Sequence, residues 1–234
     1  MNKTLNYIKN GIPLGYMIRL KLSSAASYFR GGLTRPFFGS CGKRFKRDRK
    51  TVLIQKCRMK FGAHVQIGKN CEIDALSREG IIIDDESSIA DYSVVRCTGS
   101  LAHIGKGVAI GKNSHFGDYL FMGAAGGIII GDNVIGGQNI RFHSENHIFS
   151  NPNELIVNQG VTHKGIRIGN NCWIGAGAVF LDGAVIGEGC VVAANAVVTK
   201  QFGSNLVIGG VPAKVIENRC AQSFHNGLVR SENE

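Results

Sequence analysis

Residues 168–198 read IGNNCW IGAGAV FLDGAV IGEGCV VAANAV V when they are written in groups of six. A large apolar residue opens every group: Ile168, Ile174, Phe180, Ile186, Val192 and Val198. Turn-forming residues fill the polar positions, among them Asn170, Asn171, Gly177, Asp182, Gly183 and Gly189. A period of six fits neither a helix, at 3.6 residues per turn, nor one long strand, at two. The chain must therefore turn once per group, with a short strand between turns.

The same period appears upstream, at Ile104, Ile110, Phe116, Met122 and Ile128, and it restarts two residues later at Ile130. Each group can bury one large side chain but cannot cover it alone, so the groups must stack coil upon coil. The 32 glycines and the asparagines suit the turns, because both residue types tolerate positive φ. The alternative is a β-sandwich, whose strands recur at about 8 to 12 residues and less regularly. The spacing favours an all-β solenoid.

The first 60 residues have a different character. They hold fifteen of the 27 lysines and arginines but only one of the 17 acidic residues, Asp48. Apolar residues three or four apart, separated by basic ones, predict a basic amphipathic helix over about residues 14–30, ended by Gly31 and Gly32. Its apolar positions are Leu14, Ile18, Leu22, Ala25 and Phe29.

A basic run from Lys43 to Lys50 follows this helix, and weaker repeats begin near Val65. We therefore expect three parts: a basic helical or capping segment (1–61), a solenoid domain (62–217) interrupted by a loop (141–165), and a short C-terminal tail (218–234). The basic segment has two interpretations of equal standing. In one, it binds a membrane surface or an acidic glycan; in the other, it caps the first coil of the solenoid, and the two are compatible.

The composition excludes several classes of protein. No nucleic-acid motif with interleaved aromatic residues accompanies the basic segment, so nucleic acid is the least favoured partner. The sequence has no run of 18 apolar residues, and its first residues lack the apolar stretch and small-residue cleavage site of a secretory leader, so we expect a protein that is neither secreted nor membrane-spanning. The odd number of cysteines, without zinc spacing, favours free thiols in a reducing cytoplasm. They are Cys41, Cys57, Cys71, Cys97, Cys172, Cys190 and Cys220.

We expect the catalytic residues in the loop that interrupts the repeat, because a solenoid usually breaks its repeat for a loop on its binding face. Two histidines, His143 and His147, lie in it together with Glu145. An imidazole titrates near neutral pH and can take the proton of a hydroxyl during acyl transfer. The loop therefore predicts a general base, and Glu145 either orients a nearby imidazole or is a solvated side chain.

Three motifs around this loop resemble one known family. They are Ile130-Gly131-Asp132-Asn133-Val134, then Ile168-Gly169-Asn170-Asn171-Cys172-Trp173-Ile174-Gly175, and finally Gly209-Gly210-Val211-Pro212-Ala213-Lys214. Over about residues 62–217 the chain is similar to the hexapeptide-repeat acetyltransferases that modify sugars. The resemblance implies a left-handed parallel β-helix, a homotrimer, and acetyl-coenzyme A as co-substrate, with no metal required. The left hand is an exception to the usual right-handed crossover.

The resemblance also assigns residues. The spacing from the Ile-Gly-Asp-Asn-Val motif makes His147 the catalytic base, whereas His143 matches no family position and is either a turn residue or part of an acceptor site. Trp173 matches an aromatic residue beside the active site, in contact with the acceptor or the coenzyme. The remaining coenzyme contacts implied are Ala176, Ala194, Thr199, Lys200 and Lys214. Two acceptor-positioning residues of the sugar-modifying relatives have no counterpart here, so the resemblance does not identify the acceptor.

The expected reaction is direct transfer of an acetyl group to a sugar hydroxyl of a surface polysaccharide, in the cytoplasm or at the inner face of its membrane. A serine, amino-sugar or antibiotic acetyltransferase would use the same scaffold. A γ-class carbonic anhydrase-like enzyme is a further alternative, with His115, His143 and His147 as metal ligands. A scaffold without activity is another. A cysteine nucleophile is disfavoured, because no thiol has an activating histidine and acid in a recognisable pattern.

Overall fold

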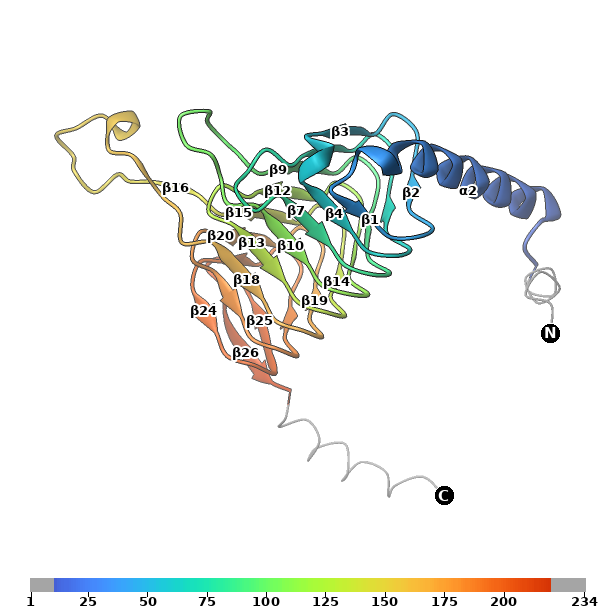
Figure 1. Cartoon of the computed structure of the whole chain (residues 1–234). Helices are drawn as coiled ribbons and strands as arrows, with labels where there is room; N and C mark the ends of the chain where they lie inside the picture. The colour runs from blue at the N-terminus through green and yellow to red at the C-terminus, as the bar shows by residue number, and fades with distance from the viewer. Residues whose placement is uncertain (1–10, 220–234) are drawn as a thin grey trace, which may run out of the picture.

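The computed structural model describes residues 11–219, which form one helix followed by a three-sided solenoid of short strands (Figure 1). Three sheets make the sides, and successive coils add one strand to each in parallel register; the exception is the last strand, which pairs antiparallel. The fold is the left-handed parallel β-helix that the family resemblance implies. None of the helices in the described part is long and apolar enough to cross a membrane.

The first sheet contains β1 (Ser40–Cys41), β4 (Met59–Phe61), β7 (Ile81–Ile83), β10 (Val108–Ile110), β13 (Ile128–Ile130), β18 (Ile166–Ile168), β21 (Val185–Ile186) and β24 (Gln201–Phe202). The second contains β2 (Lys46–Arg47), β5 (Gln66–Ile67), β8 (Ser88–Ile89), β11 (His115–Phe116), β14 (Ile135–Gly136), β19 (Trp173–Ile174), β22 (Val191–Val192), β25 (Leu206–Gly209) and β26 (Lys214–Asn218). The third contains β3 (Val52–Ile54), β6 (Glu72–Asp74), β9 (Val94–Arg96), β12 (Phe121–Gly123), β15 (Arg141–His143), β20 (Val179–Leu181) and β23 (Val197–Val198).

The six-residue period is confirmed over residues 168–198, where all six group-opening residues are at most 3% exposed. The apparent restart at Ile130 has a simple cause. Ile128 and Ile130 are two residues apart on β13, so both point inward, and the same holds for Ile166 and Ile168 on β18. Ile104 breaks the predicted pattern: it is 39% exposed, because it lies in an excursion from the solenoid and not in a coil.

The turns have the backbone geometry that their residue types predict. Asn133 and Asn171 adopt φ of 58° and 53°, and Gly177 adopts 72°. Gly175 is needed for a different reason. A Cβ there would lie 2.5 Å from the backbone nitrogen of Ala194 in the next coil, so a larger residue would push the coils apart.

The solenoid begins earlier than the predicted residue 62. Its first coil starts at Ser40, and the basic run is part of it, with β2 pairing in parallel with β5. Phe45 from within that run is 1% exposed and packs against Phe38 and Phe61, at ring-centroid distances of 5.3 Å. A strand of two residues can turn its apolar neighbours inward and its cations outward. The many charged residues are therefore the reason why this first coil was not predicted.

Helix α2 (Leu14–Thr34) is longer than the predicted 14–30, and Gly31 and Gly32 lie within it. Gly31 marks a close approach instead of an end, because a Cβ on Gly31 would lie 2.2 Å from the carbonyl oxygen of Phe45. The helix ends before the 3₁₀ turn η1 (Arg35–Phe37), which contains the first proline after it.

The helix does cover the first coil, but not with its predicted apolar face. Its buried residues are Met17, Ser27, Gly31 and Thr34, which share one side. Leu22 and Phe29 on the predicted face are 66% and 70% exposed. Figure 1 shows α2 extending away from the solenoid on the side opposite the loop of residues 144–165.

The excursions from the coils all leave at one corner, where the chain passes from the third sheet to the first; we call it the loop corner. It contains residues 55–58 with η2 (Lys56–Arg58), 75–80, 97–107, 124–127, 144–165, 182–184 and 199–200. The predicted interruption lies here, although residues 141–143 still belong to the coil as β15. The excursion 97–107 was not predicted. At the other end, β26 turns back antiparallel onto β25, and residues 220–234 of the predicted tail, Cys220 among them, lie outside the described part.

Candidate active site

The long loop at the loop corner is organised by a two-stranded antiparallel ribbon. It consists of β16 (Asn146–His147) and β17 (Val161–Thr162), with η3 (Ile156–Asn158) between them. His147 lies opposite Val161, and Asn146 lies opposite Thr162. Side chains directly opposite each other on such a ribbon share a face. The catalytic candidate is therefore held on a defined face of the loop.

The next pair along the ribbon, Glu145 and His163, shares the face of His147, because side chains alternate along each strand. The Nε2 atom of His163 lies 2.6 Å from Oε2 of Glu145. The imidazole that Glu145 contacts is thus that of His163, a residue that no sequence motif marks. The sequence places Glu145 two residues before His147 and Val161 two residues before His163. It does not show the turn between the two segments, which determines that residue 145 lies opposite residue 163.

The opposite face of the ribbon is anchored by Asp182, which is 6% exposed and comes from the next turn of the loop corner. Its carboxylate accepts hydrogen bonds from Thr162 Oγ1 at 2.8 Å, Lys164 N at 3.0 Å and Gly165 N at 2.7 Å. Asp182, expected to be a polar turn residue, is a buried clamp on the returning strand of the loop.

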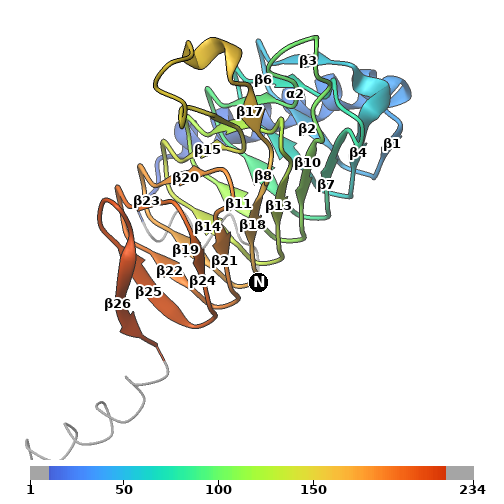
Figure 2. The same ribbon diagram turned by 90° about the vertical axis from the view of Figure 1, so that its left-hand side faces the viewer.

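The loop of residues 144–165 and the excursion 97–107 both project from the same end of the solenoid (Figure 2). Residues of both segments line a cavity of about 850 Å³. The loop contributes Glu145, His147, Val157, Gly160, Val161 and His163 to its lining. The facing wall includes Arg78, Glu79, Ala102, His103, Ile104 and Lys106. The ring of His147 is exposed and has no hydrogen-bond partner within residues 11–219. It is therefore available to a molecule bound in this cavity.

His143 does not line this cavity. It ends β15 on the outer face of the third sheet, where its ring packs on Phe121 at a centroid distance of 5.1 Å. Partial burial, together with the nearby positive charge of Arg141, lowers the pKa of His143 below its usual value. His143 is thus a packed sheet residue, neither the expected turn residue nor a wall of this cavity.

Trp173 is also far from His147 within one chain. It lies on the second sheet, opposite the loop corner, between Ile135 and Val191, and is 58% exposed. Ala176 and Ala194 are exposed at the corner between the second and third sheets. These three predicted contacts share one side of the solenoid, and His147 is on another.

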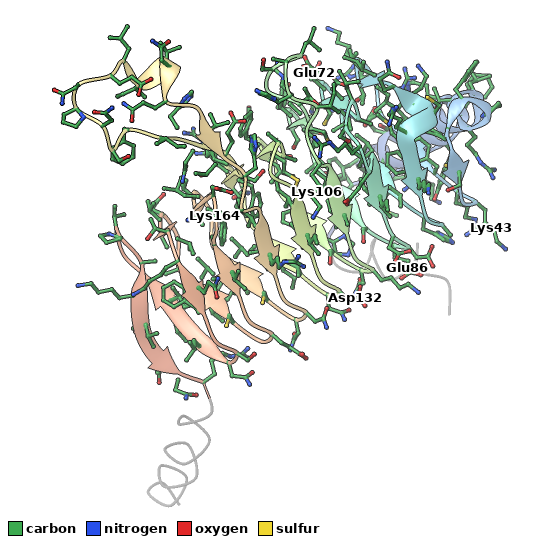
Figure 3. The ribbon with its side chains drawn as sticks, turned by 60° about the vertical axis from the view of Figure 1, so that its left-hand side comes forward. Lys43, Glu72, Glu86, Lys106, Asp132 and Lys164 are labelled. Carbon is green, nitrogen blue, oxygen red and sulfur yellow. The ribbon has the colours of Figure 1, made fainter. Side chains whose placement is uncertain are left out.

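Thr199 and Lys200, by contrast, belong to the loop corner. With Lys164 and Arg167 they line a shallow cavity of about 390 Å³ that also touches Asp182. Lys214 lies elsewhere, in β26 at the end of the second sheet. Figure 3 shows Lys106 and Lys164 on one edge of the solenoid, and Lys43, Glu86 and Asp132 on another. The loop corner therefore carries cations on both sides of His147.

The two alternative sites considered from the sequence, a metal site and a cysteine nucleophile, have little support in the described residues. His115 lies on the second sheet, where its ring contacts Ser88 and Asn113. Within residues 11–219, no three histidine, cysteine or acidic side chains gather in a way that could hold a metal ion. Burial raises the pKa of the Cys97 thiol to about 12, which disfavours the thiolate that a cysteine nucleophile needs.

Comparisons with known proteins agree with this architecture. The family "bacterial transferase hexapeptide (six repeats)" matches residues 165–200. The chain is 31% identical over 157 residues to the putative lipopolysaccharide biosynthesis O-acetyl transferase WbbJ of Escherichia coli, covering 67% of this chain and 70% of that protein. It is 35% identical over 112 residues to the galactoside O-acetyltransferase of E. coli, covering 48% of this chain and 54% of that protein. The chain spans about half the length of several curated relatives that it matches.

A solved structure shows the same fold. It is that of a mutant of AntD, an N-acyltransferase from Bacillus cereus, in complex with dTDP and coenzyme A. The two structures superpose with a TM-score of 0.53 at 20% identity, covering 86% of this chain and 96% of that one.

Proposed function

Because this chain belongs to the hexapeptide-repeat acetyltransferases, we propose that it transfers the acetyl group of acetyl-coenzyme A to a hydroxyl of a sugar. The observation that carries the proposal is the position of His147. Its unengaged imidazole faces a cavity of about 850 Å³, on a ribbon that Asp182 clamps to the solenoid. That geometry fits a base waiting for the proton of a bound acceptor.

The reaction needs no covalent enzyme intermediate. A ring nitrogen of His147 takes the proton of the acceptor hydroxyl while its oxygen attacks the thioester carbonyl. The tetrahedral intermediate then expels the coenzyme A thiolate, which receives the proton from the imidazolium. The products are the acetyl ester and free coenzyme A.

The Glu145–His163 pair would hold the acceptor beside this base. It shares the ribbon face of His147 and lines the same cavity. A carboxylate and an imidazole fixed at 2.6 Å present acceptor and donor groups to sugar hydroxyls with little left to order on binding. We assign the pair to positioning, since His147 alone matches the family base.

The coenzyme would lie along the loop corner toward Lys200. Lys164, Arg167 and Lys200 line one shallow cavity there, and cations suit the phosphates of a nucleotide. The coenzyme A bound to AntD supports this choice of co-substrate. Lys164 and Arg167 are additions to the contacts inferred from sequence.

A second subunit would complete the site. Trp173, Ala176 and Ala194 occupy a side of the solenoid that His147 of the same chain does not reach. A rotationally symmetric assembly brings one side of a subunit against a different side of its neighbour. We therefore propose a homotrimer, in which the loop corner of one chain meets the surface around Trp173 of the next.

The acceptor would be a hydroxyl of a surface polysaccharide or of its precursor, made in the cytoplasm. The name of the relative WbbJ, a putative lipopolysaccharide biosynthesis O-acetyl transferase, supports this class. The free thiols of the described residues fit a reducing compartment.

The exposed stripe of α2 would attach the enzyme to anionic lipid. Leu22, Phe29 and Leu33 are 60–70% exposed, while the other side of the helix packs on the solenoid. At 100° per residue, Arg19 lies along one border of the stripe and Lys21 along the other. Apolar residues bordered by cations are typical of helices that lie on a membrane surface.

Sedimentation with vesicles tests the lipid contact. The wild type should bind vesicles rich in phosphatidylglycerol and ignore phosphatidylcholine alone. Phe29→Glu should abolish this binding, and Ser23→Glu, an exposed position off the stripe, should not. Loss of the oligomer in Phe29→Glu without lipid binding by the wild type would instead make the stripe a contact between subunits.

Thiol release from acetyl-coenzyme A tests the reaction, with sugars, nucleotide sugars, amino sugars, serine and chloramphenicol as acceptors. We expect transfer to a sugar, with mass spectrometry identifying an O-acetyl ester and not an amide. His147→Ala should lower turnover by about two or more powers of ten, the range of a lost general base. Equal turnover by the variant would refute the base, and transfer only to an amine, serine or chloramphenicol would refute the acceptor.

A further inference from the structure

Two cavities flank the tip of the excursion 97–107, and they share one cation. The large cavity facing His147 and a smaller one of about 470 Å³ are both lined by Arg78, Ala102, His103 and Ile104. Arg78 thus lies beneath the tip, with access to both. The proposed reaction assigns it no part.

The acids around the large cavity are already engaged. Oε1 of Glu79 lies 4.0 Å from the Lys106 ammonium, and Glu145 pairs with His163. Within the described residues the Arg78 guanidinium has no acidic partner. The wall opposite His147 therefore carries an uncompensated positive charge.

Arg58 adds to that charge from behind. Its Nη1 atom donates to the carbonyl oxygen of Ser77 at 2.8 Å, and within residues 11–219 no acidic side chain pairs with it. It lines the smaller cavity together with Arg78. Two neighbouring guanidinium groups without a carboxylate attract an anion.

The backbone beneath Arg78 is fixed. Arg78 N donates to Gly105 O at 2.9 Å, and Glu79 N donates to Lys106 O at 2.9 Å. Ser77 is fully buried, and its hydroxyl accepts a hydrogen bond from Gly80 N at 3.0 Å. Little backbone order is therefore lost when an anion binds, which favours recognition.

The phosphates of the coenzyme are not the anion that we expect at Arg78, because Arg78 and Lys200 lie on opposite sides of the His147 loop. In the first sheet, Arg78 precedes β7, His147 precedes β18 and Lys200 precedes β24. At about 4.8 Å per strand, the Arg78 turn lies roughly 14 Å from the turn of the His147 loop on one side, and the Lys200 turn roughly 10 Å on the other. A coenzyme whose phosphates lie toward Lys200 leaves the Arg78 side to the acceptor.

We propose that the acceptor carries a carboxylate or phosphate group, which Arg78, backed by Arg58, recognises across the cavity from His147. The inference rests on the proposed acetyl transfer and adds the class of acceptor: an acidic sugar or a sugar phosphate, not a neutral one. Ala102 and Ile104 on the same wall give a sugar ring an apolar surface.

Matched acceptors that differ in charge test this inference. Initial rates would be compared for galactobiose, digalacturonate and galactose 1-phosphate, with wild type, Arg78→Gln and Lys43→Gln. Lys43 is an exposed cation on another edge of the solenoid, so its variant has the same loss of charge (Figure 3). We expect at least one charged acceptor to exceed galactobiose in kcat/KM by about tenfold, an advantage that Arg78→Gln removes and Lys43→Gln preserves. The charged acceptor that responds tells carboxylate from phosphate.

Equal use of charged and neutral acceptors, or equal losses in both variants, would overturn the inference and leave acetyl transfer intact. Binding of the same three sugars, measured by saturation-transfer NMR without acetyl-coenzyme A, provides a readout that does not depend on turnover. Charged sugars should bind more tightly than galactobiose, and Arg78→Gln should weaken their binding about tenfold. Binding that is insensitive to Arg78 would refute the site even if no acceptor were turned over.

Discussion

Asp182→Ala removes the clamp that joins the loop of residues 144–165 to the solenoid. The carboxylate accepts three hydrogen bonds, from Thr162 Oγ1, Lys164 N and Gly165 N. A hydrogen bond to a charged group contributes about 1.5–3 kcal/mol. Taking the lower end of that range for each bond, the three together contribute about 4.5 kcal/mol.

That loss falls on the loop and not on the coils, because the donors all lie in residues 162–165. A change of about 4.5 kcal/mol in the free energy of local opening corresponds to about three powers of ten in the opening equilibrium. Native-state hydrogen exchange should therefore show the amides of Lys164 and Gly165 exchanging up to roughly 10³ times faster in Asp182→Ala, while those of the inner coils keep their protection. The rate of acetyl transfer by Asp182→Ala should also be lower than that of the wild type, because the loop that carries His147 is less well held.

Asp132→Ala is the matched control. Its carboxylate also accepts a hydrogen bond from a backbone amide, that of Lys112 at 2.7 Å, but on another edge of the solenoid (Figure 3). It should leave the Lys164 and Gly165 amides unchanged. If Asp182→Ala leaves them unchanged as well, the clamp is not what holds the loop.

Three further outcomes follow from charge and burial. Cys57 is exposed and should be alkylated by iodoacetamide at pH 8 in the native protein, whereas Cys97, whose pKa burial raises to about 12, should react only after unfolding; prompt labelling of Cys97 would contradict its burial. Partial burial lowers the pKa of folded His143, so the unfolded chain binds that proton more readily, and stability present above the ordinary pKa of about 6.5 should be lost as pH falls through and below it. His143→Gln should narrow the difference in Tm between pH 7.5 and pH 5, and an unchanged difference would argue against this role. Glu145→Gln and His163→Gln should each lower kcat/KM by about tenfold, and the double variant should be no worse than either, because both remove one pair; additive losses would show that they act separately.

The coils were predictable because each repeats one local pattern. A large apolar residue every sixth position has few alternatives once the chain must turn that often, and Ile174 and Phe180 are fully buried as expected. The same pattern misled at Ile104, where an apolar residue in step with the period lies in an excursion. The six-residue spacing alone cannot distinguish an apolar residue inside a coil from one that has the same spacing but lies in an excursion.

The first coil was missed because its outward positions are cationic. Lys46 and Arg47 form β2, while the neighbouring Phe45 fills the interior. The helix was predictable in position but not in orientation. Its apolar stripe indicated the packing face, yet Gly31 permits a closer approach on the opposite side.

The candidate base could be proposed from its spacing to the preceding motif, but its surroundings could not. His163 meets Glu145 only through the register of β16 and β17, which depends on the long turn between them. The family resemblance implied that Trp173 lies beside the active site, yet within one chain Trp173 lies on the second sheet, away from His147. Which distant residues meet depends on the geometry of the coils and of the ribbon, and this geometry cannot be read from the sequence alone.

In the proposed homotrimer, His147 of one subunit acts beside the coenzyme-binding surface around Trp173 and Ala194 of the next subunit. Co-expression of two inactive variants, His147→Ala and Ala194→Trp, with different affinity tags tests this arrangement directly. If each site needs His147 from one chain and Ala194 from its neighbour, random 1:1 mixing in a cyclic trimer should restore about a quarter of the wild-type acetyl transfer. Mixed trimers, purified through both tags, that remain as inactive as the parents would contradict an active site shared between subunits.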